Sequence, residues 1–211
     1  MRLFDLDGPL FTAMSKLTKI VAVNIVFCIC CIPIVTIGAA TTALHDCMRA
    51  LLEEVDDDKL VRRFFKTFKQ KFIPSTILWI FCLVVFAFLF VYQNVIKDIG
   101  GTFGRSYQIM LYFLSIIFLF GFQYFFPMQA RYEVNIRYIL KNAWIVSILA
   151  LPWSLASIAT TGIMIYVSFF MNTDMIGTAA YLWLVAGFGV LSYINNIFFQ
   201  KAFEKVMPEE G

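Results

Sequence analysis

Residues 80–92 read IFCLVVFAFLFVY, a stretch without a charged residue, a glycine or a proline. A membrane-spanning β-strand alternates polar and apolar side chains over about ten residues, whereas this stretch is apolar on every side. Its uncharged neighbours extend it to residues 73–96, which exceeds the roughly 20 residues that an α-helix needs to cross the hydrocarbon core. The stretch therefore predicts a transmembrane helix.

The rest of the chain has the composition of an integral membrane protein. Of its 211 residues, 61% are hydrophobic and 15% are charged, whereas a soluble domain carries about 25% charged residues. Five long uncharged runs predict an all-α, polytopic transmembrane helical bundle that forms one membrane domain over residues 1–211. The predicted spans are residues 20–37, 73–96, 107–126, 143–169 and 178–199, with a kink or tilt near Pro152 in the fourth.

The distribution of positive charge predicts an orientation. Five crossings put the two termini on opposite sides of the membrane. With the N-terminus outside and the C-terminus in the cytoplasm, 12 Lys and Arg residues are cytoplasmic and 5 are external, as the positive-inside rule favours. The competing interpretation makes the first run a signal peptide cleaved near residues 38–40, but cleavage there would leave the basic first loop outside.

The first loop is the one connection long enough to hold structure of its own. Its first half, TTALHDCMRALLEEV (residues 41–55), reads as a helix, and the acidic run that begins at Glu53 reads as a solvated turn. Its second half, residues 58–72, spaces Leu60, Phe64, Phe68 and Phe72 four apart between cations. This pattern predicts an amphipathic helix at the inner membrane interface, with an N-cap at residue 57 or 58.

This amphipathic helix is either an anchor that sets topology or a docking surface for a partner. In both interpretations the phenylalanines lie in acyl chains and the cations face anionic headgroups or the partner. The candidate docking residues for partner or lipid are Arg62, Arg63, Phe64, Phe65, Lys66, Phe68, Lys69 and Phe72.

The three cysteines at residues 28, 30 and 31 include a C-x-x-C spacing. A thiol at hydrocarbon depth stays protonated, and a protonated thiol is a poor nucleophile and a poor metal ligand. We therefore expect packing residues, with lipidation, redox sensing and metal binding as open alternatives. Cys47 is the cysteine that we expect to be exposed. The only histidine, His45, cannot complete a zinc site alone, so no metal is predicted.

The end of the first span carries Pro33, Thr36 and Gly38, followed by small residues. Pro33 removes a helical hydrogen bond, and small side chains allow another helix to approach closely. The sequence therefore predicts a kinked exit that packs against another span.

Two segments carry specific motifs: Asn24 followed by CCIPIVTIGAATTAL (residues 30–44), and FFKTFKQKFIPSTILWI (residues 64–80). Together they resemble the YesL family of bacterial membrane proteins, whose function is unknown. The resemblance implies about five spans, a plasma membrane mainly of Gram-positive bacteria, and gene neighbourhoods with carbohydrate-uptake ABC transporters. It brings no catalytic residues and no cofactor.

Known chemistry-bearing patterns are missing from the sequence. The predicted spans contain no Asp, Glu, Lys, Arg or His, which argues against a proton- or ion-coupled transporter. Neither G-x-S-x-G nor H-E-x-x-H occurs, so we expect neither an enzyme nor a cofactor. The net charge of +3 is too small to indicate nucleic-acid binding.

These observations favour a non-enzymatic accessory membrane protein, linked to carbohydrate uptake and docking a carbohydrate ABC transporter or another membrane protein. The alternative is an uncoupled channel or facilitator for a small neutral solute, and a third interpretation is a protein that organises the lipid bilayer. Polar residues inside the spans are expected to bond between helices. The residues expected to line a solute pocket, if there is one, are Trp153, Ser154, Ser157, Asn195 and Asn196.

Overall fold

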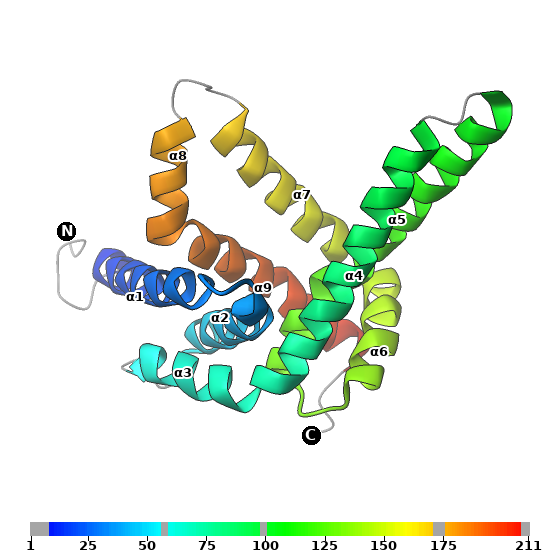
Figure 1. The fold of residues 1–211 in the computed structure, drawn as a ribbon. Helices are drawn as coiled ribbons and strands as arrows, with labels where there is room; N and C mark the ends of the chain where they lie inside the picture. The colour runs from blue at the N-terminus through cyan, green and yellow to red at the C-terminus, as the bar shows by residue number, and fades with distance from the viewer. Residues whose placement is uncertain (1–8, 56–58, 98–100, 171–175, 208–211) are drawn as a thin grey trace.

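The computed structural model describes residues 9–55, 59–97, 101–170 and 176–207, and within them it contains helices and no strands. The all-α prediction is confirmed (Figure 1). The elements are α1 (Pro9–Cys30), η1 (Ile34–Thr36), α2 (Ile37–Leu52), α3 (Leu60–Gln70), α4 (Phe72–Lys97), α5 (Gly101–Arg131), α6 (Ile136–Leu149), α7 (Leu151–Phe169), α8 (Ile176–Leu182), the π-helical turn η4 (Trp183–Gly187) and α9 (Phe188–Val206).

Five helical segments of the described chain are long and apolar enough to cross a membrane, as predicted. Their bounds correct several of the predicted ones. The first begins at Thr12 and ends at Cys30, because the chain turns before Pro33. The predicted span 143–169 divides into α6 and α7 at Ala150, so the break is more complete than a kink. Pro152 lies in the first turn of α7, where its missing N–H leaves no helical bond unmade.

The last candidate span, Gly177–Val206, is bent rather than straight. Its middle is the π-helical turn Trp183–Gly187, and α8 and α9 point in clearly different directions on either side of it (Figure 1). A π-helical turn interrupts the regular i to i−4 hydrogen bonds and frees carbonyl groups for other donors. A side chain of α1 supplies a hydrogen-bond donor to these carbonyl groups, as described below.

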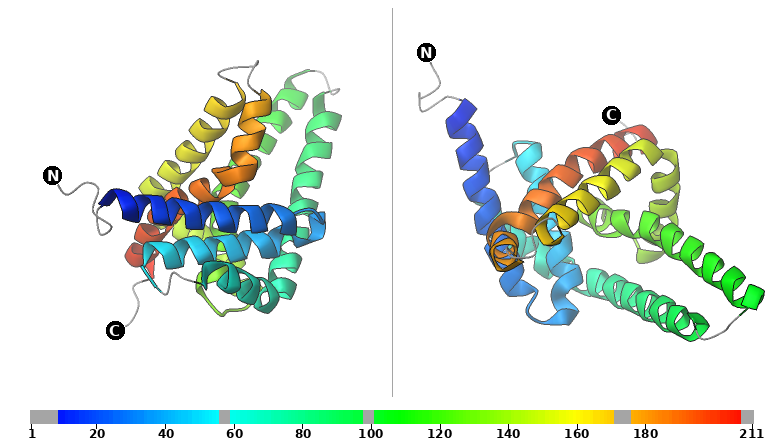
Figure 2. Two further views of the ribbon diagram at one scale, coloured as in Figure 1. Left: turned by 90° about the vertical axis from the view of Figure 1, so that its left-hand side faces the viewer. Right: turned by 90° about the horizontal axis from the view of Figure 1, so that it is seen from above.

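The chain reverses direction between α1 and α2. Beyond Cys30 it turns through Pro33 and η1, and the Thr36 hydroxyl lies within hydrogen-bond distance of the Cys30 and Pro33 carbonyls. The two helices then run side by side in opposite directions, with α1 lying crosswise to α4 and α5 (Figure 2). The predicted kink at the exit of the first span is therefore a full reversal.

Helix α2 is the most enclosed element of the described chain, and it packs against α1, α3, α4, α5 and α9. Small residues make this possible. An added Cβ at Gly38 would lie 2.5 Å from the Ser75 carbonyl oxygen and 2.6 Å from the Trp79 Cβ. One turn later, the Thr42 and Ser75 hydroxyls are hydrogen-bonded at 2.9 Å. The prediction that the exit packs against another span is confirmed.

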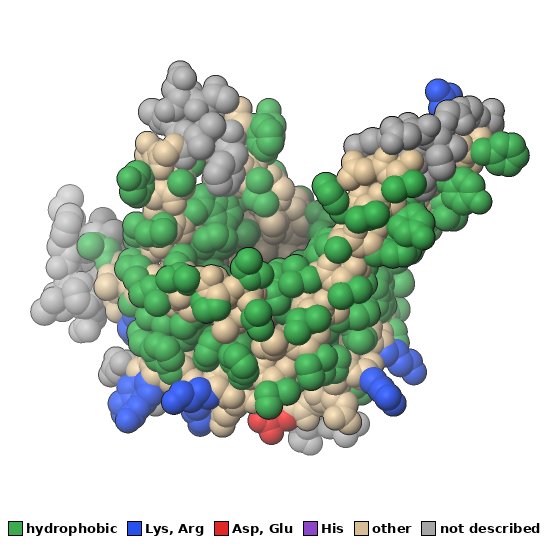
Figure 3. Space-filling model, viewed as in Figure 1, with side chains coloured by type: hydrophobic (Ala, Val, Ile, Leu, Met, Phe, Trp, Pro, Cys, Tyr) green, Lys and Arg blue, Asp and Glu red, His purple; other side chains and the backbone are tan. Residues whose placement is uncertain are grey.

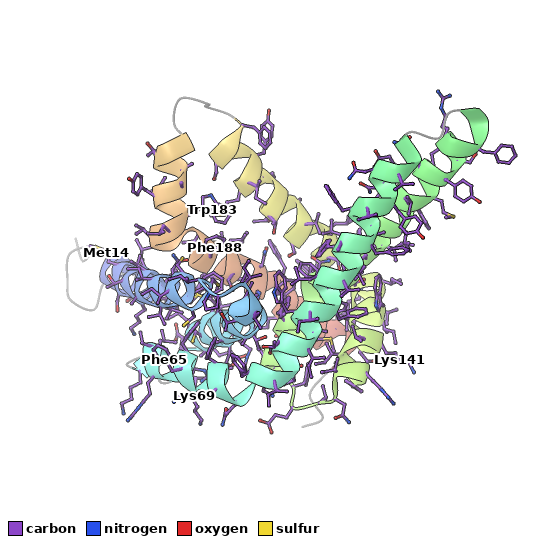
Figure 4. The ribbon with its side chains drawn as sticks, in the orientation of Figure 1. Met14, Phe65, Lys69, Lys141, Trp183 and Phe188 are labelled. Atoms are coloured by element: carbon purple, nitrogen blue, oxygen red, sulfur yellow. The ribbon has the colours of Figure 1, made fainter. Side chains whose placement is uncertain are left out.

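The molecule has two unlike ends. The α4–α5 hairpin and the α7–α8 pair diverge at one end and leave a hollow between them (Figure 1, Figure 3). Their outer surfaces are densely apolar. At the other end, near α3 and α6, Lys and Arg side chains gather, with Lys69 and Lys141 among them (Figure 3, Figure 4).

We predict that Gly38→Ala lowers the free energy of unfolding by about 1–3 kcal/mol, because the new methyl group would force α2 away from the backbone of α4. Thermal unfolding of the detergent-purified protein measures this. The matched control is Gly162→Ala in α7, where an added Cβ meets nothing within 4 Å. Equal melting temperatures for the two variants would contradict the close approach.

Candidate functional site

A buried carboxylate on α2 holds α3 in place. Asp46 is only 5% exposed. Arg63 donates to its Oδ2 from Nε at 2.8 Å and to its Oδ1 from Nη2 at 2.9 Å. Thr67 donates to Oδ2 at 2.7 Å, and Arg49 donates to Oδ1 at 3.0 Å. Three donors on two helices thus converge on one side chain, which we call the Asp46 cluster.

The protonation of Asp46 follows from these contacts. Burial alone would raise the pKa of Asp46, but the hydrogen bonds from Arg63 and Thr67 and the charges of Arg63 and Arg49 outweigh it and lower the pKa below its usual value. The carboxylate is therefore ionised at neutral pH. A buried ion pair with two-point Arg geometry fixes orientation as well as distance.

The apolar side of α3 faces protein rather than lipid. Leu60 is 4% exposed and Phe64 is fully buried, both within the core cluster that surrounds α2. The Phe64, Phe68 and Phe72 rings follow one another at 6.2 and 5.6 Å between centroids. The prediction that the phenylalanines lie in acyl chains is thus wrong for Phe64. Phe65 remains exposed (Figure 4).

A helix is present where one was predicted at residues 58–72, but α3 covers residues 60–70 and Phe72 begins α4. The predicted N-cap positions 57 and 58 lie outside the described residues. The outward surface of α3 carries Arg62, Lys66 and Lys69, which are all exposed. For these three cations no ion pair occurs with any carboxylate of the described residues. We call them the α3 cationic face.

A groove of about 440 Å³ runs beside this face, between α3 and the carboxyl end of α5. Its floor contains the Asp46 cluster. On its far side the Lys71 Nζ donates to the Tyr132 carbonyl at 3.3 Å. The charged side chains that line the groove are mostly cationic: Asp46, Arg49, Lys59, Arg62, Arg63, Lys66, Lys71, Arg131 and Glu133.

A second cavity, of about 430 Å³, lies between α2, α4, α5, α7 and α9. Of the five residues predicted for a solute pocket, Ser157 and Asn195 line it. The other three do not. Ser154 is hydrogen-bonded to Tyr124 at 2.8 Å, Trp153 stacks near Phe198 and under the Lys201 ammonium, and Asn196 bonds to His45.

The sequence did not identify His45 and Gln123 as residues of this cavity. His45 Nδ1 lies 3.0 Å from Asn196 Nδ2 and 3.1 Å from the Ser192 hydroxyl. Burial lowers the pKa of His45 to about 4, and the hydrogen bond from Asn196 offsets only part of that effect. The imidazole is therefore neutral at physiological pH. These contacts join residues about 150 positions apart, and no local pattern signals them.

Asn24 explains the bend in the last span. Its Nδ2 donates to the carbonyls of Leu184 at 2.7 Å and Trp183 at 3.2 Å, and its Oδ1 accepts from the Gly189 N–H at 2.8 Å. One amide thus satisfies two carbonyls within the π-helical turn and the N–H of Gly189, which lies just beyond it. The expectation that polar residues within the spans bond between helices is met by Asn24 and by Asn195, which donates to Thr161.

The cysteines are all unpaired. Cys28, Cys30 and Cys31 are partly buried and pack against the core cluster around α2. Cys47 is fully buried, so the expectation that it would be exposed is wrong. The Cys47 side chain faces α3, and its Sγ lies 3.4 Å from the Leu60 carbonyl oxygen. Within the described residues, no three His, Cys, Asp or Glu side chains gather as a metal site would require.

Comparison with known proteins gives one family match. A model described as a protein of unknown function, DUF624, matches residues 20–92. This segment contains the second half of α1, all of α2 and α3, and most of α4, and therefore the complete Asp46 cluster. No curated protein and no solved structure matches the chain.

We predict that Asp46→Asn destabilises the protein by roughly 3 kcal/mol, because it leaves Arg63 without its buried counter-charge. Thermal unfolding at pH 7 measures the loss. The contribution is present above the ordinary pKa of 3.8 and is lost as pH falls through the lowered folded-state pKa. The control is Glu54→Gln, which removes an exposed ion pair with Lys16 and should leave the melting temperature unchanged. Equal effects would contradict the assigned role of Asp46.

Proposed function

We propose that this protein is a non-enzymatic accessory component of a bacterial plasma membrane, of the YesL type. In this proposal it docks a carbohydrate-uptake ABC transporter, or another membrane protein, through the α3 cationic face. The coarser statement, a helical membrane protein related in part to a family of unknown function, rests on the fold and the family match. The link to carbohydrate uptake rests on the resemblance of residues 24–80 to the YesL family.

One observation carries the docking proposal: α3 is held by its buried side while its cations stay exposed. The Asp46 cluster uses Arg63 and leaves Arg62, Lys66 and Lys69 outward. A helix that only anchored the chain to lipid would bury its phenylalanines in acyl chains, whereas Phe64 is buried in the protein core. A preformed cationic surface loses little conformational entropy when an acidic partner binds.

Among the described residues, the Ser192 hydroxyl lies beside the His45 imidazole. The same ring nitrogen also accepts a hydrogen bond from Asn196, which favours a binding role over a catalytic one. The polar groups around the second cavity are hydroxyls, amides and one imidazole. The imidazole is already bonded to Asn196 and Ser192, and the cysteines of the described chain are partly or fully buried. A nucleophile would need an adjacent base that is free to accept its proton.

The structure also supports an orientation different from the one that five crossings predict. The Lys16 Nζ lies 2.9 Å from the Glu54 Oε1, which joins the first half of α1 to the end of α2. At the other end of α1, the Trp79 Nε1 donates to the Ile34 carbonyl at 2.9 Å. Trp79 is seven residues into α4, or about 10 Å along a helix of 26 residues that is about 39 Å long.

We therefore propose that α1 and α2 form a hairpin that enters the membrane from the cytoplasmic side and returns without crossing. The turn exposes Ile32, Ile34 and Val35, which suits contact with hydrocarbon. Both termini are then cytoplasmic, and only Lys97 and Arg105, of the 17 Lys and Arg residues, are external. This distribution satisfies the positive-inside rule better than an external N-terminus does.

We expect reversal of the α3 cationic face, by Arg62→Glu, Lys66→Glu and Lys69→Glu together, to reduce recovery of transporter membrane subunits at least fivefold. Recovery is measured by mild crosslinking in cells, affinity purification and mass spectrometry. Arg63 is left unchanged because its loss would disturb the Asp46 cluster. The control reverses Arg137 and Lys141, which are exposed on α6 at the same end of the molecule. Unchanged recovery, or equal loss in the control, would refute docking through α3.

The proposed orientation predicts that epitope tags at both ends of the chain resist protease added to intact protoplasts. Both tags should be digested in inverted membrane vesicles. A third tag inserted after Ile99 serves as the control and should show the opposite pattern. Digestion of the N-terminal tag on intact protoplasts, with the C-terminal tag protected, would support five crossings instead.

A further inference from the structure

The cavity between α2, α4, α5, α7 and α9 contains amide atoms that no group of the described residues satisfies. Gln123 has both Nε2 and Oε1 buried without a hydrogen-bond partner in the described part of the chain. Asn195, 8% exposed, uses its Nδ2 on Thr161, but its Oδ1 has no partner. A buried polar group without a hydrogen-bond partner destabilises the folded state. Native proteins rarely keep such groups without a use for them.

The rest of the cavity wall is neutral and largely apolar. Aromatic side chains form much of it, including Trp79, Phe122, Phe126 and Phe199, and no Asp, Glu, Lys or Arg lines it. His45 is held neutral by burial. A carboxylate or ammonium group placed there would lose its hydration without gaining a counter-charge. The wall therefore selects an uncharged ligand.

The hydrogen-bonding capacity of the wall is small and local. The Thr41 hydroxyl already donates to the Ile37 carbonyl, and the Thr161 hydroxyl donates to the Ser157 carbonyl. The buried atoms of the wall that lack a partner among the described residues are one amide NH₂ group and two amide oxygens, on Gln123 and Asn195. The Ser157 hydroxyl and the His45 imidazole also line the cavity. A sugar presents several hydroxyls, most of which would lose their hydration here without a partner. A single hydroxyl or amide head group fits this capacity.

The position of the cavity is also that of a lipid-accessible site. The lining residues of α5 and α7 come from helices whose outer surfaces are densely apolar. The hollow between the α4–α5 and α7–α8 pairs has a hydrophobic rim (Figure 3). A molecule with an apolar body could enter between these helices from the bilayer.

We propose that this cavity binds a neutral amphiphile, with a hydroxyl or amide head group hydrogen-bonded to Gln123 and Asn195 and an apolar body against the aromatic wall. This site is separate from the α3 cationic face and does not depend on the docking role.

The test uses the full-length protein in phosphatidylcholine nanodiscs with two diazirine-bearing probes, hexadecanol and hexadecanoate. Photolabelling by the alcohol should fall on peptides of α5, α7 or α9, should be displaced by excess hexadecanol, and should exceed labelling by the carboxylate at least fivefold. Gln123→Leu and Asn195→Leu should each reduce labelling by the alcohol at least fivefold. Gln93→Leu, which removes an amide from α4 outside this cavity, should label as the wild type does.

Thermal unfolding separates ligand binding from folding defects. Gln123→Leu removes an unsatisfied buried amide, so its melting temperature should equal or exceed that of the wild type while labelling is lost. Equal labelling by alcohol and carboxylate, or full labelling of Gln123→Leu, would overturn the proposal. Saturable binding of radiolabelled glycerol that depends on Gln123, without labelling by the alcohol, would replace it with a site for a water-soluble solute.

Discussion

The small side chains at the start of α2 are the constraint on which the rest of the structure depends. Five helices pack against this one, and interhelical distance is set by the side chains between the axes. At Gly38 the backbone of α4 is already in contact, and Ala39, Ala40 and Ala43 are fully buried. In a membrane, where apolar burial between helices gains little over lipid, such close contact is a main source of helix association.

The Asp46 cluster holds a strongly basic helix, α3, against a hydrophobic core. Arg63 and Thr67 face inward with Leu60 and Phe64, and Asp46 neutralises the one cation that this placement brings in. The remaining cations of α3, Arg62, Lys66 and Lys69, are exposed and form no ion pair within the described residues. The division is between the two sides of a single helix, so the same element contributes to stability and to a surface suited to anionic partners.

Much of the fold could be predicted from the sequence, because the thickness of the hydrocarbon core sets the length of the uncharged run that a crossing helix needs. The amphipathic α3 could be predicted for a similar reason, since its period is local. What the sequence could not supply is what an apolar residue touches. Phe64 fits lipid and protein core equally well, and Cys47, in a polar segment, is buried by α3. The reversal after Cys30 was predicted only as a kinked exit, because an uncharged run does not show how far the chain turns at its end.

The candidate site shows the same limit more strongly. Ser157 and Asn195 were identified as polar residues in apolar runs, but the partners that set their role come from distant helices. His45 was assigned to a cytoplasmic loop, yet it bonds to Asn196 on α9 and lines the cavity. Residues adjacent in sequence thus serve opposite sides of α2, because successive side chains on a helix point about 100° apart.

This arrangement places α2 between the two sites. Asp46 bonds to α3, beside the cationic groove, while His45 bonds to α9, beside the cavity. Both are carried by one enclosed helix whose backbone touches α4 at Gly38. A movement of α3 that keeps the Asp46 hydrogen bonds must move α2, and α2 cannot move without shifting His45 and the cavity wall. Energetic coupling between sites needs an element with two arrangements that both sites bias, and α2 is the element that contacts both.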